Sequence, residues 1–286
     1  MTVIVHGATG AQGSPVLTAL QTAGIPAIAA VRNTHTLPEG VTGVAVDLAD
    51  AAALTAVYAG ADGVFIHLPL GGPEHTRAQA DAIAQAVTAA RPARVVISTS
   101  GAIVDQPDSP LQAPADSPIT TLIRAVAHSG VSYAVVAPRL YLENLLLPVV
   151  HGPAREEGIL RYPLPAEYPV SWSSHLDVAE VVVRLLADPT IGGTVAVGHA
   201  PGLVGADLAA AFASVWDRDV RFEAITPERF GELITPIFGP GAAPVIGLYQ
   251  ALNTQDRFTI AMENSAQQLL GLSPRPVEQW VRELGA

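Results

Sequence analysis

The stretch that decides the fold is residues 2–13, which read Thr2-Val3-Ile4-Val5-His6-Gly7-Ala8-Thr9-Gly10-Ala11-Gln12-Gly13. A short β-branched run leads directly into glycines spaced G-x-x-G-x-x-G, and Ser14-Pro15 then opens a helical pattern. A tight turn needs glycine, and a diphosphate can reach backbone N–H groups only where no Cβ intervenes. Proline also suits the first turn of a helix. A strand, a glycine turn and a helix in this order predict a dinucleotide-binding unit.

Working outward from this unit, short apolar strands alternate with alanine-rich helical stretches along the first 140 residues. The strand candidates are Thr2–His6, Ala27–Val31, Val44–Val46, Gly63–Leu68, Arg94–Ser98 and Ser132–Ala137. Helical patterns lie between them near residues 15–23, 51–58, 74–90 and 118–129. Strands without polar alternation, separated by helices, are typical of a parallel sheet covered on both faces. We therefore expect an α/β fold, a Rossmann-type doubly wound sheet.

The second half of the chain has a different character, with prolines and glycines dense over Pro138–Pro169 and Pro236–Pro244. We expect a dinucleotide-binding domain over residues 1–140 and a smaller α/β substrate lobe over 141–286. Within the second part, a helix at Asp177–Ala187 and a strand at Thr194–Val197 are expected to return to the main sheet, so 177–198 belongs with the first domain. The remaining helical patterns lie near residues 206–216, 227–234, 244–256 and 276–284. The functional cleft is expected between the lobe and the carboxyl ends of the strands.

Composition excludes several classes of partner and of chemistry. The 286 residues include 15 basic ones, all arginine, against 26 acidic ones, for a formal net charge of -11. Nucleic-acid surfaces and membrane anchors need clustered positive charge, so neither partner is expected. The lack of lysine removes Schiff-base chemistry and the Tyr-x-x-x-Lys proton relay, and the lack of cysteine removes disulfides and thiolates.

Hydrophobic residues make up 49% of the chain and charged residues 14%, which allows a sizeable core. The N-terminus has no basic segment followed by a long apolar one, so we expect a cytoplasmic protein. The expected partner is a small-molecule substrate, and a homodimer is left open as the assembly.

The end of the second strand indicates which dinucleotide is bound. NAD-binding units usually place an acidic residue there, on the ribose 2′-hydroxyl, but this chain has Arg32. A guanidinium suits a 2′-phosphate, so we expect NADP(H) as the cofactor. The alternative is an arginine that merely reaches solvent. Asp47, at the end of the third strand, could accept a hydrogen bond from the adenine, whereas the helix beginning near Asp50 needs Asp50 as its cap.

Beyond these motifs, the chain resembles the NmrA-like branch of the atypical short-chain dehydrogenases/reductases. The resemblance rests on Gly7–Gly13, on Val31-Arg32-Asn33 and on Pro138-Arg139-Leu140-Tyr141-Leu142-Glu143-Asn144, and continues through Asp177-Val178-Ala179. It implies a Rossmann domain with a small C-terminal lobe, and NADPH-dependent reduction of quinones or triphenylmethane dyes, or cofactor binding without turnover. It also implies that the segment Pro138–Asn144 and the loop after His67 form walls of the cofactor and substrate sites.

The candidate site residues follow from these arguments. The cofactor candidates are Gly7, Thr9, Gly10, Ala11, Gln12, Gly13, Arg32, Asp47, Leu48, His67, Leu68, Pro69, Ser98, Pro138 and Leu140. The catalytic candidates are Tyr141, Ser98 and Ser100, whose hydroxyls could hydrogen-bond a substrate oxygen, and the substrate candidates are His75, Tyr141 and Asn144. The ordinary alternatives are that the serines cap a turn and that Tyr141 only buries its ring. No metal site is expected, because the histidines lack ligand spacing.

Three functions are compatible with these residues. The favoured one is an enzyme that uses NADPH to reduce a small apolar carbonyl, quinone, enone or imine by direct hydride transfer, without the tyrosine–lysine relay. The alternative is a redox sensor that binds NADP(H) without catalysis and must then distinguish the oxidised from the reduced form. A lyase or isomerase with a fixed dinucleotide stays open as the third.

Overall fold

The computed structural model describes residues 1–69 and 71–285, and the chain divides into two compact units. Unit 1 comprises Met1–Pro138, His175–Val197 and Glu263–Leu272. Unit 2 comprises Arg139–Ser174, Gly198–Met262 and Ser273–Ala286. The helix and strand between residues 175 and 197 thus lie in unit 1 together with the glycine turn. Residues 263–272 also belong to unit 1, which the sequence analysis does not anticipate.

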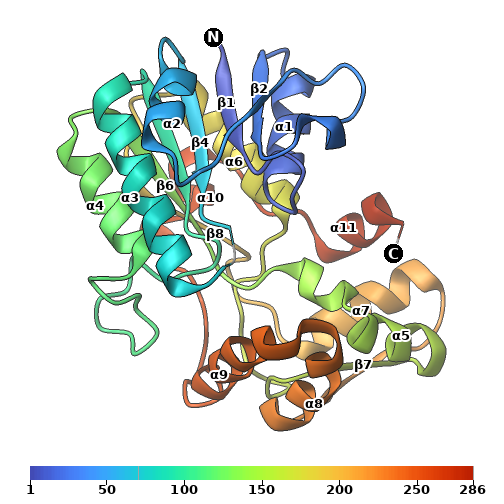
Figure 1. Cartoon of the computed structure of the whole chain (residues 1–286). Coiled ribbons are helices and arrows are strands. Elements are labelled where there is room, and N and C mark those ends of the chain that lie inside the picture. The colour runs from blue at the N-terminus through green and yellow to red at the C-terminus, as the bar shows by residue number, and fades with distance from the viewer. Residues whose placement is uncertain (70, 286) are drawn as a thin grey trace. The chain divides into compact units, whose positions relative to one another are not determined.

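Unit 1 is built on one sheet of seven parallel strands in the order β3-β2-β1-β4-β5-β6-β8 (Figure 1). The strands are β1 Val3–His6, β2 Ala27–Val31, β3 Gly43–Ala45, β4 Gly63–His67, β5 Arg94–Ser98, β6 Ser132–Pro138 and β8 Gly193–Val197. The strand order reverses direction between β1 and β4, and such a switch point is where doubly wound sheets bind ligands. The expected Rossmann-type fold is therefore confirmed.

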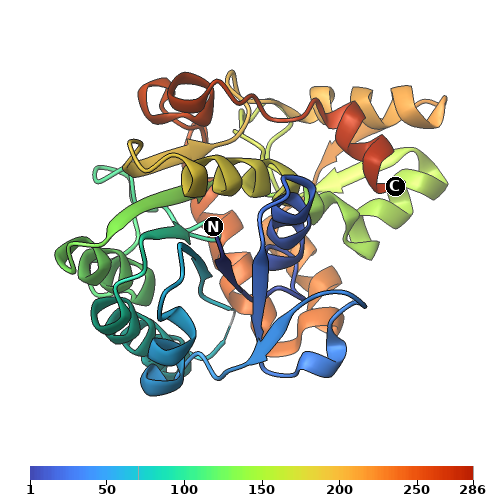
Figure 2. The ribbon, with the colours of Figure 1, turned by 90° about the horizontal axis from the view of Figure 1, so that it is seen from above.

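Helices cover both faces of this sheet. The helices α2 (Ala51–Tyr58), α3 (Pro73–Ala90) and α4 (Pro118–His128) pack side by side on one face, and α1 (Gly13–Thr22) and α6 (His175–Ala187) on the other (Figure 2). Alternate strand residues point to opposite faces. Accordingly Val64 and Ile66 of β4 and Val95 and Ile97 of β5 share one buried cluster with residues of α2, α3 and α4. Burial on both faces explains why these strands lack polar alternation.

The helix boundaries follow local chemistry. The Asp50 carboxylate accepts hydrogen bonds from the Ala52 and Ala53 amides at 3.0 Å each and begins α2. Asp50 is therefore the cap, as the sequence predicts. Gly24, with φ +69, follows the end of α1, where a left-handed residue closes a helix. Shorter pieces complete the unit: η1 (Thr34–Thr36), η4 (Met262–Asn264, which starts in unit 2) and α10 (Ala266–Leu270).

Unit 2 is built around a two-stranded parallel sheet of β7 (Ile159–Tyr162) and β9 (Arg221–Ala224). Its helices are α5 Pro148–Glu157, α7 Gly205–Trp216, α8 Pro227–Phe238, α9 Ala242–Leu252 and α11 Val277–Leu284, with η2 Leu142–Leu146 and η3 Gly239–Gly241. The core is aromatic, because the Tyr162 ring lies 5.4 to 5.9 Å from the rings of Trp172, Phe230 and Tyr249. The elements β7, β9 and α5 are not predicted from the sequence.

Across the described residues, every helix is too short or too polar to span a lipid bilayer.

Candidate functional site

The turn after β1 is shaped by three glycines. Gly7 has φ +57, a left-handed conformation, and its carbonyl accepts a hydrogen bond from the Gly10 amide at 2.8 Å. A Cβ on Gly13 would lie 2.2 Å from that carbonyl oxygen, and a Cβ on Gly7 would lie 2.4 Å from Nε2 of His67. The close approach of chain to chain therefore requires glycine at both positions.

This turn leaves donors facing solvent at the start of α1. Thr9, Gly10 and Ala11 are exposed. Within residues 1–69 and 71–285, the backbone amides of Thr9, Ala11 and Gln12 donate no hydrogen bond. Free amides beside a helix N-terminus attract anions, because the helix dipole adds to their own partial charge. The turn can therefore bind the diphosphate of a dinucleotide.

Arg32 follows β2, the strand next to β1, and its side chain is exposed. Among the described residues, no acidic side chain pairs with it, so its guanidinium is free to bind a phosphate. Asp47 does not end the third strand as expected, because β3 already ends at Ala45. The Asp47 carboxylate is exposed and accepts a hydrogen bond from the Ala49 amide at 2.9 Å, while Leu48 is buried in the core.

Three histidines gather at the carboxyl edge of β1 and β4. His6 is fully buried, and its Nε2 lies 2.6 Å from the Tyr58 hydroxyl. Burial, with a smaller effect of His67, lowers the pKa of His6 to about 3. Burial likewise lowers the pKa of His67, and burial together with the charge of His67 lowers that of His175 to about 4. All three are therefore neutral near pH 7.

The end of β5 is tied to the glycine turn by the side chain of Gln12. Ser98 Oγ donates a hydrogen bond to Oε1 of Gln12 at 2.8 Å, and Nε2 of Gln12 donates to Ser100 Oγ at 2.9 Å. Ser98 is fully buried and also accepts from the Ser100 amide at 3.2 Å. The hydroxyl proton of Ser98 is thus committed to Gln12, whereas that of Ser100 can still be donated to a ligand.

Three other candidates of unit 1 follow β4, in the loop and in the first turn of α3. His75 is exposed on the first turn of α3, and its Nε2 lies 3.0 Å from Nε2 of Gln79. Leu68 and Pro69, which follow β4, are half-buried. Leu70, the next residue along the chain, lies outside the described residues.

The segment after β6 crosses from one unit to the other. Pro138 ends β6 in unit 1, whereas Leu140, Tyr141 and Asn144 belong to unit 2. Tyr141 is half-buried and pairs with Ser173 in an isolated bridge. The Asn144 side chain hydrogen-bonds the hydroxyls of two buried tyrosines, Tyr162 and Tyr249, which also bond to each other. Asn144 thus fastens η2 to the aromatic core of unit 2.

Unit 1 therefore brings together most of the candidates expected for the cofactor. At the carboxyl edge of its sheet lie the glycine turn, Arg32, His67, Ser98 and Ser100. The sequence does not predict that the half-buried His175 lies close enough to His67 for the charge of His67 to lower its pKa. No local signal reveals it, because the two residues are far apart in sequence.

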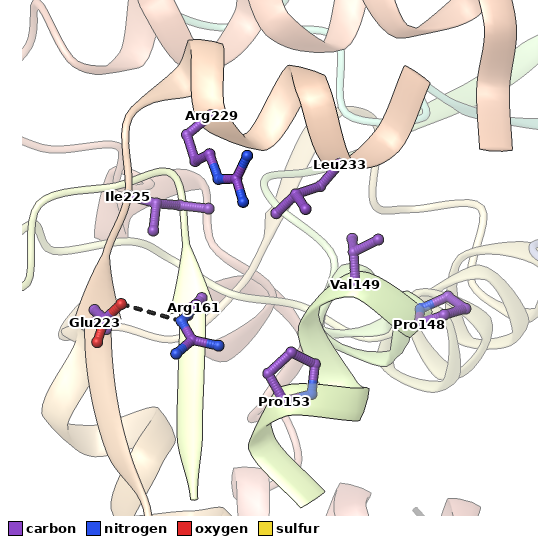
Figure 3. A pocket seen from close by; sticks show the side chains of 8 residues that line it. All are labelled: Pro148, Val149, Pro153, Arg161, Glu223, Ile225, Arg229 and Leu233. Atoms are coloured by element: carbon purple, nitrogen blue, oxygen red, sulfur yellow. Dashed lines mark hydrogen bonds and ion pairs between the residues drawn. The ribbon is translucent and has the colours of Figure 1, made fainter. Parts of the chain in front are cut away.

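Unit 2 contains a pocket of about 570 Å³ (Figure 3). It is lined by Pro148, Val149, Pro153, Arg161, Glu223, Ile225, Arg229 and Leu233. Arg161 donates to Glu223 at 3.0 Å and to Glu157 at 2.8 Å, and Arg229 donates to Glu232 at 2.6 Å. Both arginines of the lining are thus paired with carboxylates, of which only Glu223 itself lines the pocket, and the remaining wall is apolar.

Among residues 1–69 and 71–285, no three histidine or acidic side chains gather as metal ligands would.

Comparison with known proteins identifies relatives of this chain. The NmrA-like family matches residues 1–281. The NAD(P)H azoreductase of Xenophilus azovorans is 34% identical over 238 residues, which are 82% of this chain and 80% of that protein.

Solved structures share the fold at lower identity. The Citrobacter sp. triphenylmethane reductase complexed with NADP(H) has a TM-score of 0.80 at 19% identity, over 99% of each chain. The NADPH-dependent quinone oxidoreductase of Escherichia coli, complexed with NADPH, has a TM-score of 0.74 at 20% identity, over all of both chains. A nucleoside-diphosphate-sugar epimerase of Staphylococcus aureus has a TM-score of 0.76 at 20% identity, over 99% of this chain and 100% of that one. With a match over residues 1–281 and the azoreductase as a relative, this chain belongs to the NmrA-like family.

Proposed function

We propose that this chain is an NADP(H)-dependent reductase that delivers hydride to a small, mostly apolar acceptor. The observation that carries the proposal is the open glycine turn at the switch point, with the free guanidinium of Arg32 at the end of the neighbouring strand. The azoreductase, quinone and triphenylmethane relatives support reduction as the reaction. We include azo compounds and triphenylmethane dyes with the quinones, enones, carbonyls and imines as acceptor classes.

The residues of unit 1 fit NADP(H). The amides of Thr9, Ala11 and Gln12 would hold the diphosphate, and Arg32 would pair with the 2′-phosphate in a charge-assisted hydrogen bond. When bound, the nicotinamide supplies the hydride. Because His6 and His67 are neutral, the partial positive charge at the turn comes from the loop amides. The Ser100 hydroxyl would donate a hydrogen bond to an oxygen of the ligand.

The proposed mechanism uses no tyrosine–lysine pair, because the chain contains no lysine. Reduction of a quinone or a conjugated acceptor spreads the new charge over the acceptor, so water or a hydroxyl can supply the proton after hydride transfer. Tyr141 is the residue whose hydroxyl we propose for this protonation. We also propose that unit 2 binds the substrate and that the protein acts in the cytoplasm, with a homodimer as one assembly to test.

The test is oxidation of NADPH in the presence of a 1,4-naphthoquinone, an azo dye, a triphenylmethane dye, an enone and an imine. We expect at least one acceptor to be consumed in step with NADPH. Tight NADPH binding without turnover across all five classes would contradict the reductase.

The second candidate function is a redox sensor, favoured by the missing lysine. A sensor must bind NADPH and NADP⁺ with unequal affinity, because only a difference in affinity shifts a conformational equilibrium. Equal affinities and no turnover would exclude both functions, whereas unequal affinities without turnover would favour the sensor.

A further inference from the structure

The side chain of Gln12 joins two loops that come from different strands. Gln12 belongs to the turn after β1, while Ser98 ends β5 and Ser100 follows it. The amide of Gln12 is used at both ends, since Oε1 accepts from Ser98 at 2.8 Å and Nε2 donates to Ser100 at 2.9 Å. One side chain thus hydrogen-bonds to a residue 86 positions away in the sequence.

The position of this hydrogen-bonded bridge in the sheet relates it to the cofactor site. The strand between β1 and β5 is β4, whose last residue, His67, pairs in register with Ser98. Neighbouring strands lie about 4.8 Å apart, so the two loops follow strands about 10 Å apart. A dinucleotide lies across this switch point, with one mononucleotide on each half of the sheet. Gln12 therefore links the half with the phosphate turn to the half expected to hold the nicotinamide.

The backbone at Ser100 needs such support. Ser100 has φ +54, and Gly101 has φ +92. A non-glycine residue in the left-handed region costs about 1–3 kcal/mol and persists where its surroundings hold it. The hydrogen bond from Gln12 is one of the contacts that hold Ser100, and it leaves the hydroxyl proton of Ser100 available.

We infer that Gln12 is a positioning residue, which holds the Ser100 hydroxyl where it can donate to the nicotinamide carboxamide or to an acceptor oxygen. Ser98 then acts through Gln12 and does not touch the ligand, because its hydroxyl proton is committed to Oε1 of Gln12. This inference rests on the proposed NADP(H) site and assigns separate roles to two serines that the sequence treats alike.

The experiment compares two ligands on the Gln12→Leu variant, which keeps the side-chain size and loses both hydrogen bonds. The ligands are NADPH and adenosine 2′,5′-bisphosphate, which carries the adenosine half without the nicotinamide. Loss of a hydrogen bond is worth about 0.5–1.5 kcal/mol, so we expect NADPH to bind about threefold to tenfold more weakly. The bisphosphate should bind as it does to the wild type. The matched control is Gln21→Leu, at an exposed position of α1, the helix that follows the turn.

A second variant guards against a fold defect in the first. Ser100→Ala removes the hydroxyl that Gln12 holds, without altering the glycine turn, and it should show the same difference between the two ligands. The double variant should bind NADPH no more weakly than Ser100→Ala alone, because Gln12 acts on the ligand through the Ser100 hydroxyl.

Three outcomes would overturn the inference. An equal loss of affinity for both ligands would mean that Gln12 only shapes the phosphate-binding turn and does not position Ser100. Unchanged NADPH affinity in Gln12→Leu would leave the bridge without a positioning role, although the proposed NADP(H) site would stand. A wild-type chain that binds no NADPH would remove the proposed function and this inference together.

Discussion

Arg32 is the residue that determines the choice of dinucleotide in this account, because its guanidinium is exposed at the end of β2. We predict that Arg32→Glu weakens NADPH binding by about 1.5–3 kcal/mol, through loss of a charge-assisted pair and added repulsion. NADH, which lacks the 2′-phosphate, should be affected far less. The measurement is calorimetric titration of the variant with both cofactors.

The matched control is Arg124→Glu, which makes the same charge change at an exposed position on α4. An equal loss in both variants would mean that only the net charge matters, and an unchanged NADPH affinity in Arg32→Glu would mean that Arg32 merely reaches solvent.

Gly13 allows a second prediction at the scale of a residue. A Cβ there would lie 2.2 Å from the Gly7 carbonyl oxygen, so Gly13→Ala should lower the free energy of unfolding by about 1–3 kcal/mol. The matched control is Gly152→Ala in α5, where the new Cβ meets nothing within 4 Å. Alanine should raise stability there by about 0.5–1 kcal/mol, because glycine is a poor helix former. Urea unfolding measures both, and a stable Gly13→Ala protein with intact NADPH binding would refute the close approach.

At the scale of an element, Asp50 sets the start of α2 through its bonds to the Ala52 and Ala53 amides. Asp50→Ala should cost about 1 kcal/mol of unfolding free energy, and Asp50→Asn should cost much less because it keeps the cap. Urea denaturation of the three proteins decides this, and identical losses for alanine and asparagine would show that the cap is not what matters.

The elements also show how far the sequence could be read. The main-sheet strands were predicted because burial on both faces gives them unbroken apolar runs, and Gly7–Gly13 identified the turn between β1 and α1. In unit 2, α5 was missed since Gly152 and Pro153 disfavour a helix, and β7 has only four residues beside a glycine. The Gln12 bridge could not be predicted, because it joins residues that only the folded sheet brings together.

At the scale of the whole molecule, stability should depend on pH through the histidines that desolvation keeps neutral. His6 and His175 titrate in the folded state at about 3 and about 4, whereas an unfolded histidine titrates near 6.5. Between those values the unfolded state binds more protons, so their contribution is complete above about pH 6.5 and falls as the solution is acidified. Each should cost up to about 2 kcal/mol by pH 5.

Urea unfolding at pH 5.0 and pH 7.5 measures this loss, and His175→Gln should reduce the difference between the two. The carboxylates with lowered pKa values, such as Glu157 and Glu223 beside Arg161, lose their contribution only at lower pH, through and below their usual range. A stability that is the same at both pH values would show that the histidines are not held neutral by burial.

The glycine turn and Arg32 together form the proposed NADP(H) site. The most direct test is calorimetric titration of the wild-type chain with NADPH, NADP⁺, NADH and NAD⁺. A 2′-phosphate paired with Arg32 predicts that NADPH binds at least about tenfold more tightly than NADH, and NADP⁺ at least about tenfold more tightly than NAD⁺. Equal or tighter binding of NADH and NAD⁺, or no binding of any form, would contradict an NADP(H) site at this turn.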